Sequence, residues 1–231
     1  MGKKVIVLRR PGRPVLAAML LIPALLLSLG RLAGEEIMEP VLAPALFGVS
    51  IVIDPGHGGW DPGMVGDAAK EKDVNLAAGM KLAEYCRAAG ASVTLTRQED
   101  AALAESKRED LQARADLGRE ADIFISLHCN SFVAGPAQHG AQVFYAAGNE
   151  EGQRLAEALQ LSLRDRIGTT DRNALPHPDS YLLRNLEGPA VIVEMGFLSN
   201  AAEEERLAAS AYQWDLAWAL FSGIADYLAA E

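Results

Sequence analysis

Two imidazoles and two carboxylates have the types and spacing that a hydrolytic metal site needs. His57 lies in DPGHGG, His128 in SLHCN and Glu194 in VIVEMGF, each at or just past the end of a short apolar run. Because ligands bind at the carboxyl ends of the strands of an open parallel sheet, side chains from three strands can meet there. Glu71 stands in KEKDVN at the start of a predicted helix, and the loop before it can bring its carboxylate back toward His57.

The donor set of His57, Glu71 and His128 suits Zn²⁺. Two imidazoles and one carboxylate leave a fourth position for water, which is typical of a catalytic zinc site rather than a structural one. Taken singly, a histidine at a strand end is more often a hydrogen-bonded core residue, and a glutamate at a helix start more often interacts with the helix dipole. Taken together at converging strand ends, the three residues indicate a metal site.

Glu194 has a different predicted role. It ends the run AVIV, which we expect to be buried on both faces, so an ionised carboxylate there needs a partner or a chemical function. Beside a metal site it can accept the proton of the attacking water and pass it to a leaving nitrogen. We therefore predict that Glu194 is the catalytic residue. The alternative is a structural salt bridge, for example with Arg184 or Arg97.

Several neighbouring polar residues are candidates for supporting roles. Asn130 and Ser131 follow His128 and are expected to orient a ligand or the substrate, and Asp54 is expected to hydrogen-bond in the turn and support His57. Arg97, next to a strand end, has two interpretations: it faces a peptide carboxylate, or it pairs with a structural acid.

The remaining aromatic, histidine and cysteine residues give weaker signals. Trp60 either stacks on a sugar or caps the core, and the sequence does not separate these. His139 and His177 lie in loops and are expected to be exposed and uninvolved. We expect Cys86 to pack on the apolar side of a helix, and Cys129 to point to the sheet face opposite His128, so that neither is a metal ligand.

Strands that alternate with helices must position these residues. We expect strands in VSIVID, ASVTLT, DIFISL, GAQVFY and AVIVEM, and helices over residues 72–89, 105–118, 150–166, 181–187 and most of 201–229. Residues 168–180, with GTTDRN and PHPD, have the composition of an irregular loop that borders the site. The pattern predicts a single α/β domain of three layers, with a mainly parallel sheet flanked by helices.

The first residues of the chain predict a membrane segment ahead of that domain. Five basic residues and no acid precede an uncharged stretch, PVLAAMLLIPALLLSLG. This pattern predicts a signal-anchor or a signal peptide over residues 1–33, then a tether over 34–48 and the catalytic domain over 49–231. We favour the uncleaved anchor, because LAG is a poor cleavage site. A buried core helix fits badly with the flanking cations. The catalytic domain is then expected outside the cytoplasm, on the outer face of the membrane or secreted.

Charge excludes one class of partner. Without its first 34 residues the chain has 15 basic and 31 acidic residues, a formal net charge of −16. Nucleic-acid binding requires a basic surface, so we expect no nucleic-acid partner. Most of the acids are expected to form a solvated surface.

The motifs DPGHGG, EKD, SLHCNS and VEMGFLSN, in this order across residues 51–231, resemble those of the zinc-dependent N-acetylmuramoyl-L-alanine amidases of the amidase 3 type. The resemblance implies that His57, Glu71 and His128 bind zinc and that Glu194 is the catalytic glutamate. It also implies peptidoglycan as substrate, cut at the amide between N-acetylmuramic acid and L-alanine. The short domain and the N-terminal segment are most similar to spore-cortex members, which prepare muramic acid for δ-lactam formation.

Two other functions compete with this assignment. A zinc carboxypeptidase that trims stem peptides is disfavoured, because no HxxE, HExxH or HxH pairing surrounds the histidines. A non-catalytic wall-binding module would have at least one altered position among the metal and glutamate residues, and none is altered. The sequence leaves open whether an accessory protein is required.

Overall fold

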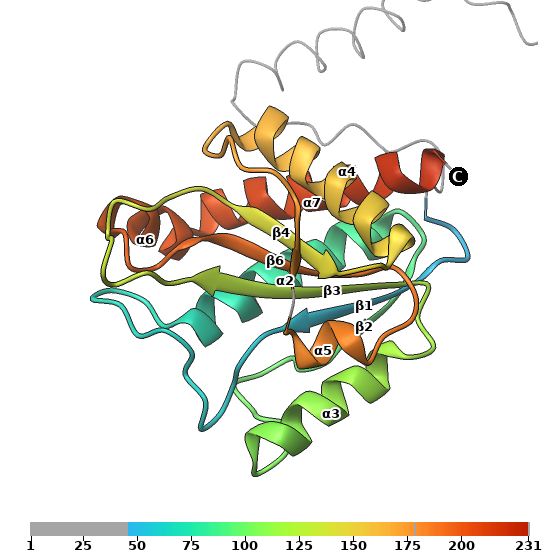
Figure 1. Ribbon diagram of the computed structural model, residues 1–231, viewed down its shortest axis with the longest axis horizontal. Coiled ribbons are helices and arrows are strands. Elements are labelled where there is room, and N and C mark those ends of the chain that lie inside the picture. Colours follow the sequence, from blue (N-terminus) through green and yellow to red (C-terminus); the bar gives the residue numbers. More distant parts are fainter. Residues whose placement is uncertain (1–45, 178, 231) are drawn as a thin grey trace, which may run out of the picture. The chain divides into compact units, whose positions relative to one another are not determined.

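The computed structural model describes residues 46–177 and 179–230. Its six strands are β1 (Ser50–Pro55), β2 (Ser92–Leu95), β3 (Ile123–Asn130), β4 (Gln142–Ala146), β5 (Leu175–His177) and β6 (Ala190–Phe197). They form one sheet in the order β2-β1-β3-β6-β4-β5 (Figure 1). β2, β1, β3 and β6 run parallel, whereas β4 is antiparallel to β6 and β5 is parallel to β4. The mainly parallel sheet is therefore confirmed, with a reversed pair at one edge.

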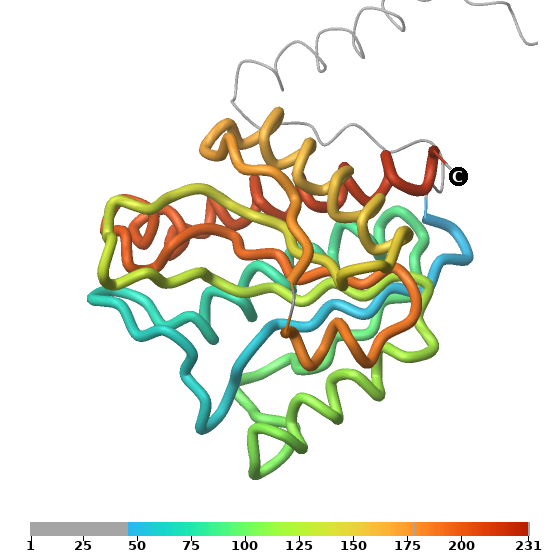
Figure 2. Tube along the Cα trace, in the orientation of Figure 1, coloured from blue at the N-terminus to red at the C-terminus, as the bar shows by residue number. Residues whose placement is uncertain are grey.

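Helices cover both faces of the sheet, as the alternating sequence pattern predicts (Figures 1 and 2). They are α2 (Glu71–Ala88), α3 (Lys107–Gly118), α4 (Glu150–Ile167), α5 (Tyr181–Arg184), α6 (Ala201–Ala208) and α7 (Ser210–Ala229). The larger core lies between the sheet and α2, α4 and α7, and it includes Ile53, Leu127 and Val193. A smaller core lies under α3 and α5 and includes Val52 and Phe124.

Helix ends follow local capping chemistry. α4 begins where the Asn149 side chain accepts a hydrogen bond from the Gly152 amide, and ends at Gly168, whose φ of 68° is left-handed. Ser106 caps α3 by accepting from the Glu109 amide. These caps satisfy backbone groups that a helix leaves without partners at its ends, so they fix where the connecting loops begin.

The edge strand β5 was not expected. Residues 168–180 were predicted to be an irregular loop, but Leu175–His177 pairs with β4. A strand of three residues is hard to predict when turn-forming residues such as Asn173 and Pro176 lie in or beside it. A proline is tolerated on an edge strand because the side of the strand that lacks its N–H faces away from the sheet. The reversed direction of β4 follows from its connection, since residues 131–141 contain no helix that could carry the chain back for a parallel return.

The predicted membrane segment (1–33) and most of the tether (34–48) lie outside the described residues. Within residues 46–177 and 179–230, no helix has the length and apolar character required to cross a bilayer.

One sheet face changes from apolar to polar toward the carboxyl ends of the parallel strands. On the face under α3 and α5, Val52 is followed along β1 by Asp54, and Phe124 along β3 by Ser126 and then His128. On β6, Ala190 and Ile192 are followed by Glu194. Because alternate residues of a strand share a face, these polar groups form a band where the small core ends.

Candidate metal centre and its surroundings

His57 sits on a loop that is held in an unfavourable backbone conformation. Its φ of 63° is left-handed, a state that costs a non-glycine residue about 1–3 kcal/mol. The Arg114 guanidinium donates a 2.7 Å hydrogen bond to the His57 carbonyl, and the imidazole Nδ1 lies 2.9 Å from Asp61 Oδ2. Lys107 contacts the same carboxylate oxygen. These contacts fix the ring with Nε2 directed toward Glu71.

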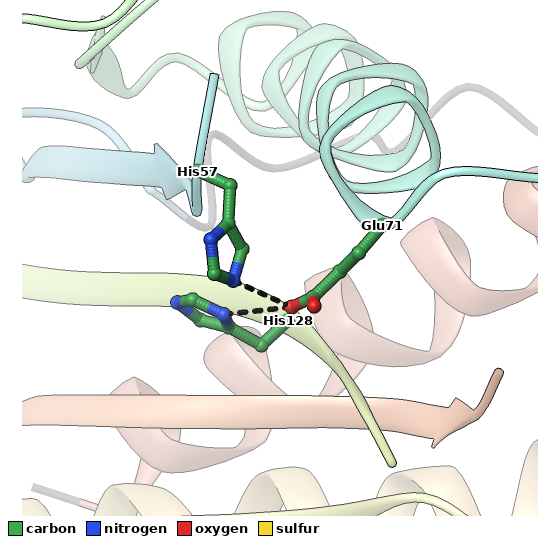
Figure 3. A group of neighbouring side chains, drawn as sticks. All are labelled: His57, Glu71 and His128. Atoms are coloured by element: carbon green, nitrogen blue, oxygen red, sulfur yellow. Dashed lines mark hydrogen bonds and ion pairs between the residues drawn. The ribbon is translucent and has the colours of Figure 1, made fainter. Parts of the chain in front are cut away.

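Glu71 joins the two histidines (Figure 3). Its Oε1 lies 3.0 Å from His57 Nε2 and 2.9 Å from His128 Nδ1. The same oxygen accepts a 3.1 Å hydrogen bond from the Cys129 amide, and Oε2 accepts a 2.8 Å bond from the Met64 amide. Glu71 is the first residue of α2, where the helix dipole favours a negative charge. The carboxylate is buried and fixed in position by backbone groups.

Two glycines make room for this cluster. A Cβ on Gly56 would lie 2.3 Å from Cε1 and Nε2 of His128, and a Cβ on Gly63 would lie 2.5 Å from Glu71 Oε2 and 2.8 Å from His57 Cδ2. Gly63 also has a φ of 65°. The DPGHGG and DPG motifs therefore supply space at the site as well as turns.

Glu71 and His128 perturb each other's protonation, and His57 acts on Glu71. Burial alone would raise the pKa of Glu71, but hydrogen bonds and charge from His128 and His57 outweigh it and lower this pKa well below its ordinary value. Burial would lower the pKa of His128, but the Glu71 bond and the charge of Glu194 raise it. The cluster thus favours an ionised carboxylate, which is the form that binds a cation.

The donor set fits a zinc ion. One ligand atom from each of His57, Glu71 and His128 lies within 4.8 Å of the others. Two imidazoles and one carboxylate match the ligand types of catalytic zinc sites, and the Asp61 bond to the second nitrogen of His57 matches the carboxylate that usually orients a zinc-binding imidazole. Sequence reasoning assigned this supporting role to Asp54 and missed Asp61.

Glu194 lies beside the cluster without a partner. It is the register partner of His128 across β3 and β6, so the two side chains share a face. Its Oε2 is buried and accepts no hydrogen bond from the described residues. Burial raises the pKa of Glu194 to about 7, with His128 opposing this rise and Glu71 adding to it. The alternative of a structural salt bridge is wrong, because Arg184 pairs with Asp179 and Arg97 binds backbone carbonyls.

The supporting residues differ from expectation. Asp54 lies in β1 and accepts bonds from Thr96, Ser126 and Arg114, so it supports His57 only indirectly, through Arg114. Arg97 is buried, and its bonds go to the carbonyls of Pro55, Gly56, Lys72 and Glu99, so among the described residues it does not pair with a structural acid.

Asn130 is bonded locally: its side chain accepts from the Ser131 amide.

The weaker candidates are also placed. Trp60 is 51% exposed and donates to the Ala104 carbonyl, so it does not cap the core. His139 is exposed as expected, but His177 is partly buried in β5 with its ring edge against Phe144.

Both cysteines are buried and free. Cys86 packs in the larger core, as expected, and Cys129 points into that core, opposite His128. Burial raises the pKa of both thiols, so each is kept in the neutral form.

Comparison with known proteins agrees with this site. Residues 51–226 match the family model for N-acetylmuramoyl-L-alanine amidase. The germination-specific N-acetylmuramoyl-L-alanine amidase of Bacillus subtilis is 37% identical over 209 residues, which cover 85% of this chain and 86% of the relative. The Clostridioides difficile CwlD amidase, solved in complex with the GerS lipoprotein, has a TM-score of 0.76 and 34% identity, covering 79% of this chain and 100% of that one.

The catalytic domain of the amidase CwlV from Bacillus (Paenibacillus) polymyxa is also similar, with a TM-score of 0.69 and 30% identity over 79% of this chain and 99% of that one. The family match over residues 51–226 includes His57, Glu71, His128 and Glu194. This chain belongs to the N-acetylmuramoyl-L-alanine amidase family and is a peptidoglycan amidase.

Proposed function

We propose that this amidase is zinc-dependent, with His57 Nε2, Glu71 Oε1 and His128 Nδ1 as the metal ligands and Glu194 as the catalytic residue. The observation that carries the proposal is the convergence of three ligand atoms within 4.8 Å beside a buried carboxylate oxygen that accepts no hydrogen bond from the part of the chain that the structure describes. The bond cleaved is the amide between N-acetylmuramic acid and the L-alanine of the stem peptide.

Glu194 moves the proton in this mechanism. Bound zinc would polarise the amide carbonyl and lower the pKa of water to about 7. The free Oε2 of Glu194 accepts the proton of the attacking water and then delivers it to the nitrogen of the departing L-alanine, which cannot leave as an anion. Burial raises the pKa of Glu194 to about 7, and the charge of a bound zinc ion would lower it, so the carboxylate is ionised and can accept a proton near neutral pH.

The residues around the cluster hold this arrangement. Arg114 fixes the His57 backbone and Asp61 orients its imidazole, while two backbone amides direct the Glu71 carboxylate toward both histidines. Positioning of this kind removes the need for the ligands to reorganise during the reaction. The strained φ of His57 is maintained by these bonds.

The biological setting is proposed from the relatives. The similarity to a germination-specific amidase and to CwlD supports a role in spore cortex maturation, through removal of the peptide before δ-lactam formation. That setting requires action outside the cytoplasm, which agrees with a signal-anchor or signal peptide over residues 1–33. The GerS complex of CwlD supports an accessory protein partner for this chain.

Mass spectrometry of purified peptidoglycan after incubation with the zinc-loaded protein tests this function. We expect new L-alanine amino ends together with muramic acid that lacks its peptide, and we expect neither product after zinc is removed. Release of D-alanine alone would indicate a carboxypeptidase instead. Binding to peptidoglycan without any product would indicate a wall-binding module.

A further inference from the structure

Beyond Glu194, the polar band continues onto the reversed strand β4. Gln142 is the antiparallel register partner of Glu194, so its side chain lies on the same sheet face as Glu194 and His128. Gln142 Oε1 accepts a 3.2 Å hydrogen bond from Arg172 Nη1. Arg172 comes from the loop between α4 and β5. The order across the sheet is thus the metal cluster, Glu194, Gln142 and Arg172.

The Arg172 guanidinium is held rigidly at the end of this band. Its Nε donates 2.9 Å to the His139 carbonyl and its Nη2 donates 2.8 Å to Gln138 Oε1. The group also lies over the ring of Phe197, 4.9 Å from its centre. Phe197 is in β6, three residues past Glu194. A guanidinium held in this way has already lost most of its freedom to reorient before any ligand arrives.

The charge of Arg172 is not neutralised by the surrounding protein. The guanidinium donates to one backbone carbonyl, that of His139, and to the side-chain amide oxygens of Gln142 and Gln138. Among residues 46–177 and 179–230, no carboxylate pairs with it. A guanidinium has five N–H groups, so these bonds leave donors available. In a chain with a net charge of −10, a half-buried arginine without an acidic partner is suited to bind an anion from outside the protein.

The chemistry of the reaction fixes which part of the substrate reaches Arg172. Glu194 must protonate the nitrogen of L-alanine, so that nitrogen lies on the Glu194 side of the metal cluster. The peptide continues from this nitrogen, and the sugar lies on the other side of the amide. Because Gln142 and Arg172 lie beyond Glu194 in the same direction, the peptide rather than the glycan extends toward them.

We propose that Arg172 binds a carboxylate of the stem peptide and thereby selects substrates with a free acid near the cleaved amide. The inference rests on the proposed function, because it uses Glu194 as the proton donor to the leaving nitrogen. The α-carboxylate of the second stem residue, a glutamate linked through its side chain, is the acid nearest the cleaved bond. Amidation of that group removes its charge and would weaken recognition.

The test compares two soluble muropeptides that differ at one group. One carries the free α-carboxylate on its second stem residue and the other carries a carboxamide there. We expect the zinc-loaded wild-type protein to have a kcat/KM about 10- to 100-fold higher for the carboxylate, which is the range of a charge-assisted hydrogen bond. The difference should appear mainly in KM, because Arg172 contacts a group away from the reacting atoms.

Variants at Arg172 complete the test. Arg172→Gln should lose the preference and cut both muropeptides with similar kcat/KM, whereas Arg172→Lys should restore part of it. Arg119→Gln is the matched control, since Arg119 is exposed, pairs with Asp116 and precedes the amino end of β3, away from the site. A purely structural role for Arg172 would slow both muropeptides equally and leave their ratio unchanged.

The outcomes separate this inference from the proposed function. Equal cleavage of the two muropeptides by the wild-type protein would overturn the role of Arg172 while leaving the zinc amidase account intact. A preference that persists in Arg172→Gln would also overturn it. A wild-type protein that binds zinc and cuts neither muropeptide nor intact peptidoglycan would instead contradict the proposed function.

Discussion

Gly56→Ala tests whether the space around His128 is essential. The added Cβ would lie 2.3 Å from Cε1 and Nε2 of the ring and 2.8 Å from Nδ1. Since ordinary van der Waals contact begins at 3.4 Å, the ring must withdraw by about 1.1 Å. The backbone cannot move away easily, because the Gly56 carbonyl accepts from Asn75 and Arg97 and its amide donates to Leu127.

A displacement of this size is large for a metal ligand. Zinc–nitrogen distances tolerate about 0.2 Å, and a misplacement of about 1 Å at a reacting centre can lower the rate by about 100-fold. We expect Gly56→Ala to bind zinc at least 10-fold more weakly and to lose at least about 100-fold in kcat/KM. Competition with a chromophoric chelator measures the affinity, and release of muropeptide amino ends measures the rate.

Gly188→Ala is the control, because a Cβ there meets only the Ala121 carbonyl at 3.8 Å. It should bind zinc and turn over as the wild type does. If Gly56→Ala also keeps wild-type zinc affinity and activity, the packing of His128 against the glycine turn is not what positions the ligand, and the reasoning is wrong.

Three further predictions concern the proton carrier, the buried ion pair and the metal. Glu194→Gln should retain one zinc per chain by elemental analysis and lose about 100- to 10,000-fold in kcat; substantial remaining activity would remove Glu194 from the mechanism. Asp54→Asn should lower the free energy of unfolding by about 1–3 kcal/mol, because it removes one of the two buried carboxylates that pair with Arg114 and leaves Asp110 as the other. The exposed Asp116→Asn should change it by less than about 1 kcal/mol in urea titrations. Burial would raise the pKa of Asp54, but Arg114, Ser126 and Thr96 lower it below the ordinary value of 3.8. The contribution of ionised Asp54 to stability is therefore present above pH 3.8 and is lost as the pH falls through the lowered pKa. An acid unfolding curve that Asp54→Asn leaves unchanged would contradict this. Dialysis against a chelator should abolish activity, and added Zn²⁺ should restore it; full activity in zinc-free protein would exclude a metal mechanism.

The convergence of His57, Glu71 and His128 could be predicted because it depends on strand ends. His57 and His128 follow apolar runs that must be parallel strands, and Glu71 begins the helix that returns between them. The parallel connections bring these residues to one edge of the sheet whatever the details of the loops. The helices and the core residues could also be predicted, because the spacing of apolar residues shows which face of each element is buried.

The interactions within loops could not be predicted. The bond from Asp61 to His57 depends on a left-handed φ at His57, which sequence pattern does not specify at a histidine. Arg97 was expected either to face a peptide carboxylate or to pair with a structural acid, but within the described residues its place beneath the glycine turn gives it backbone carbonyls as partners. The number of residues in a loop limits how far a side chain can reach, but it does not fix the direction in which that side chain points.

The reversed edge of the sheet also escaped prediction, and with it the neighbour of Glu194. Gln142 lies opposite Glu194 only because β4 runs antiparallel to β6, and the short strand β5 then follows β4. A one-residue shift in that register would turn Gln142 to the other face. Register depends on packing between distant segments, so the place of Arg172 beside the site required the structure.

Anomalous diffraction at the zinc absorption edge, from crystals of the zinc-loaded protein, would show whether His57, Glu71 and His128 hold one zinc ion. We expect one strong peak bonded to His57 Nε2, Glu71 and His128 Nδ1, with the Glu194 carboxylate beside its open side. A peak held by other residues, or the two imidazoles turned away from a common ion, would contradict the account.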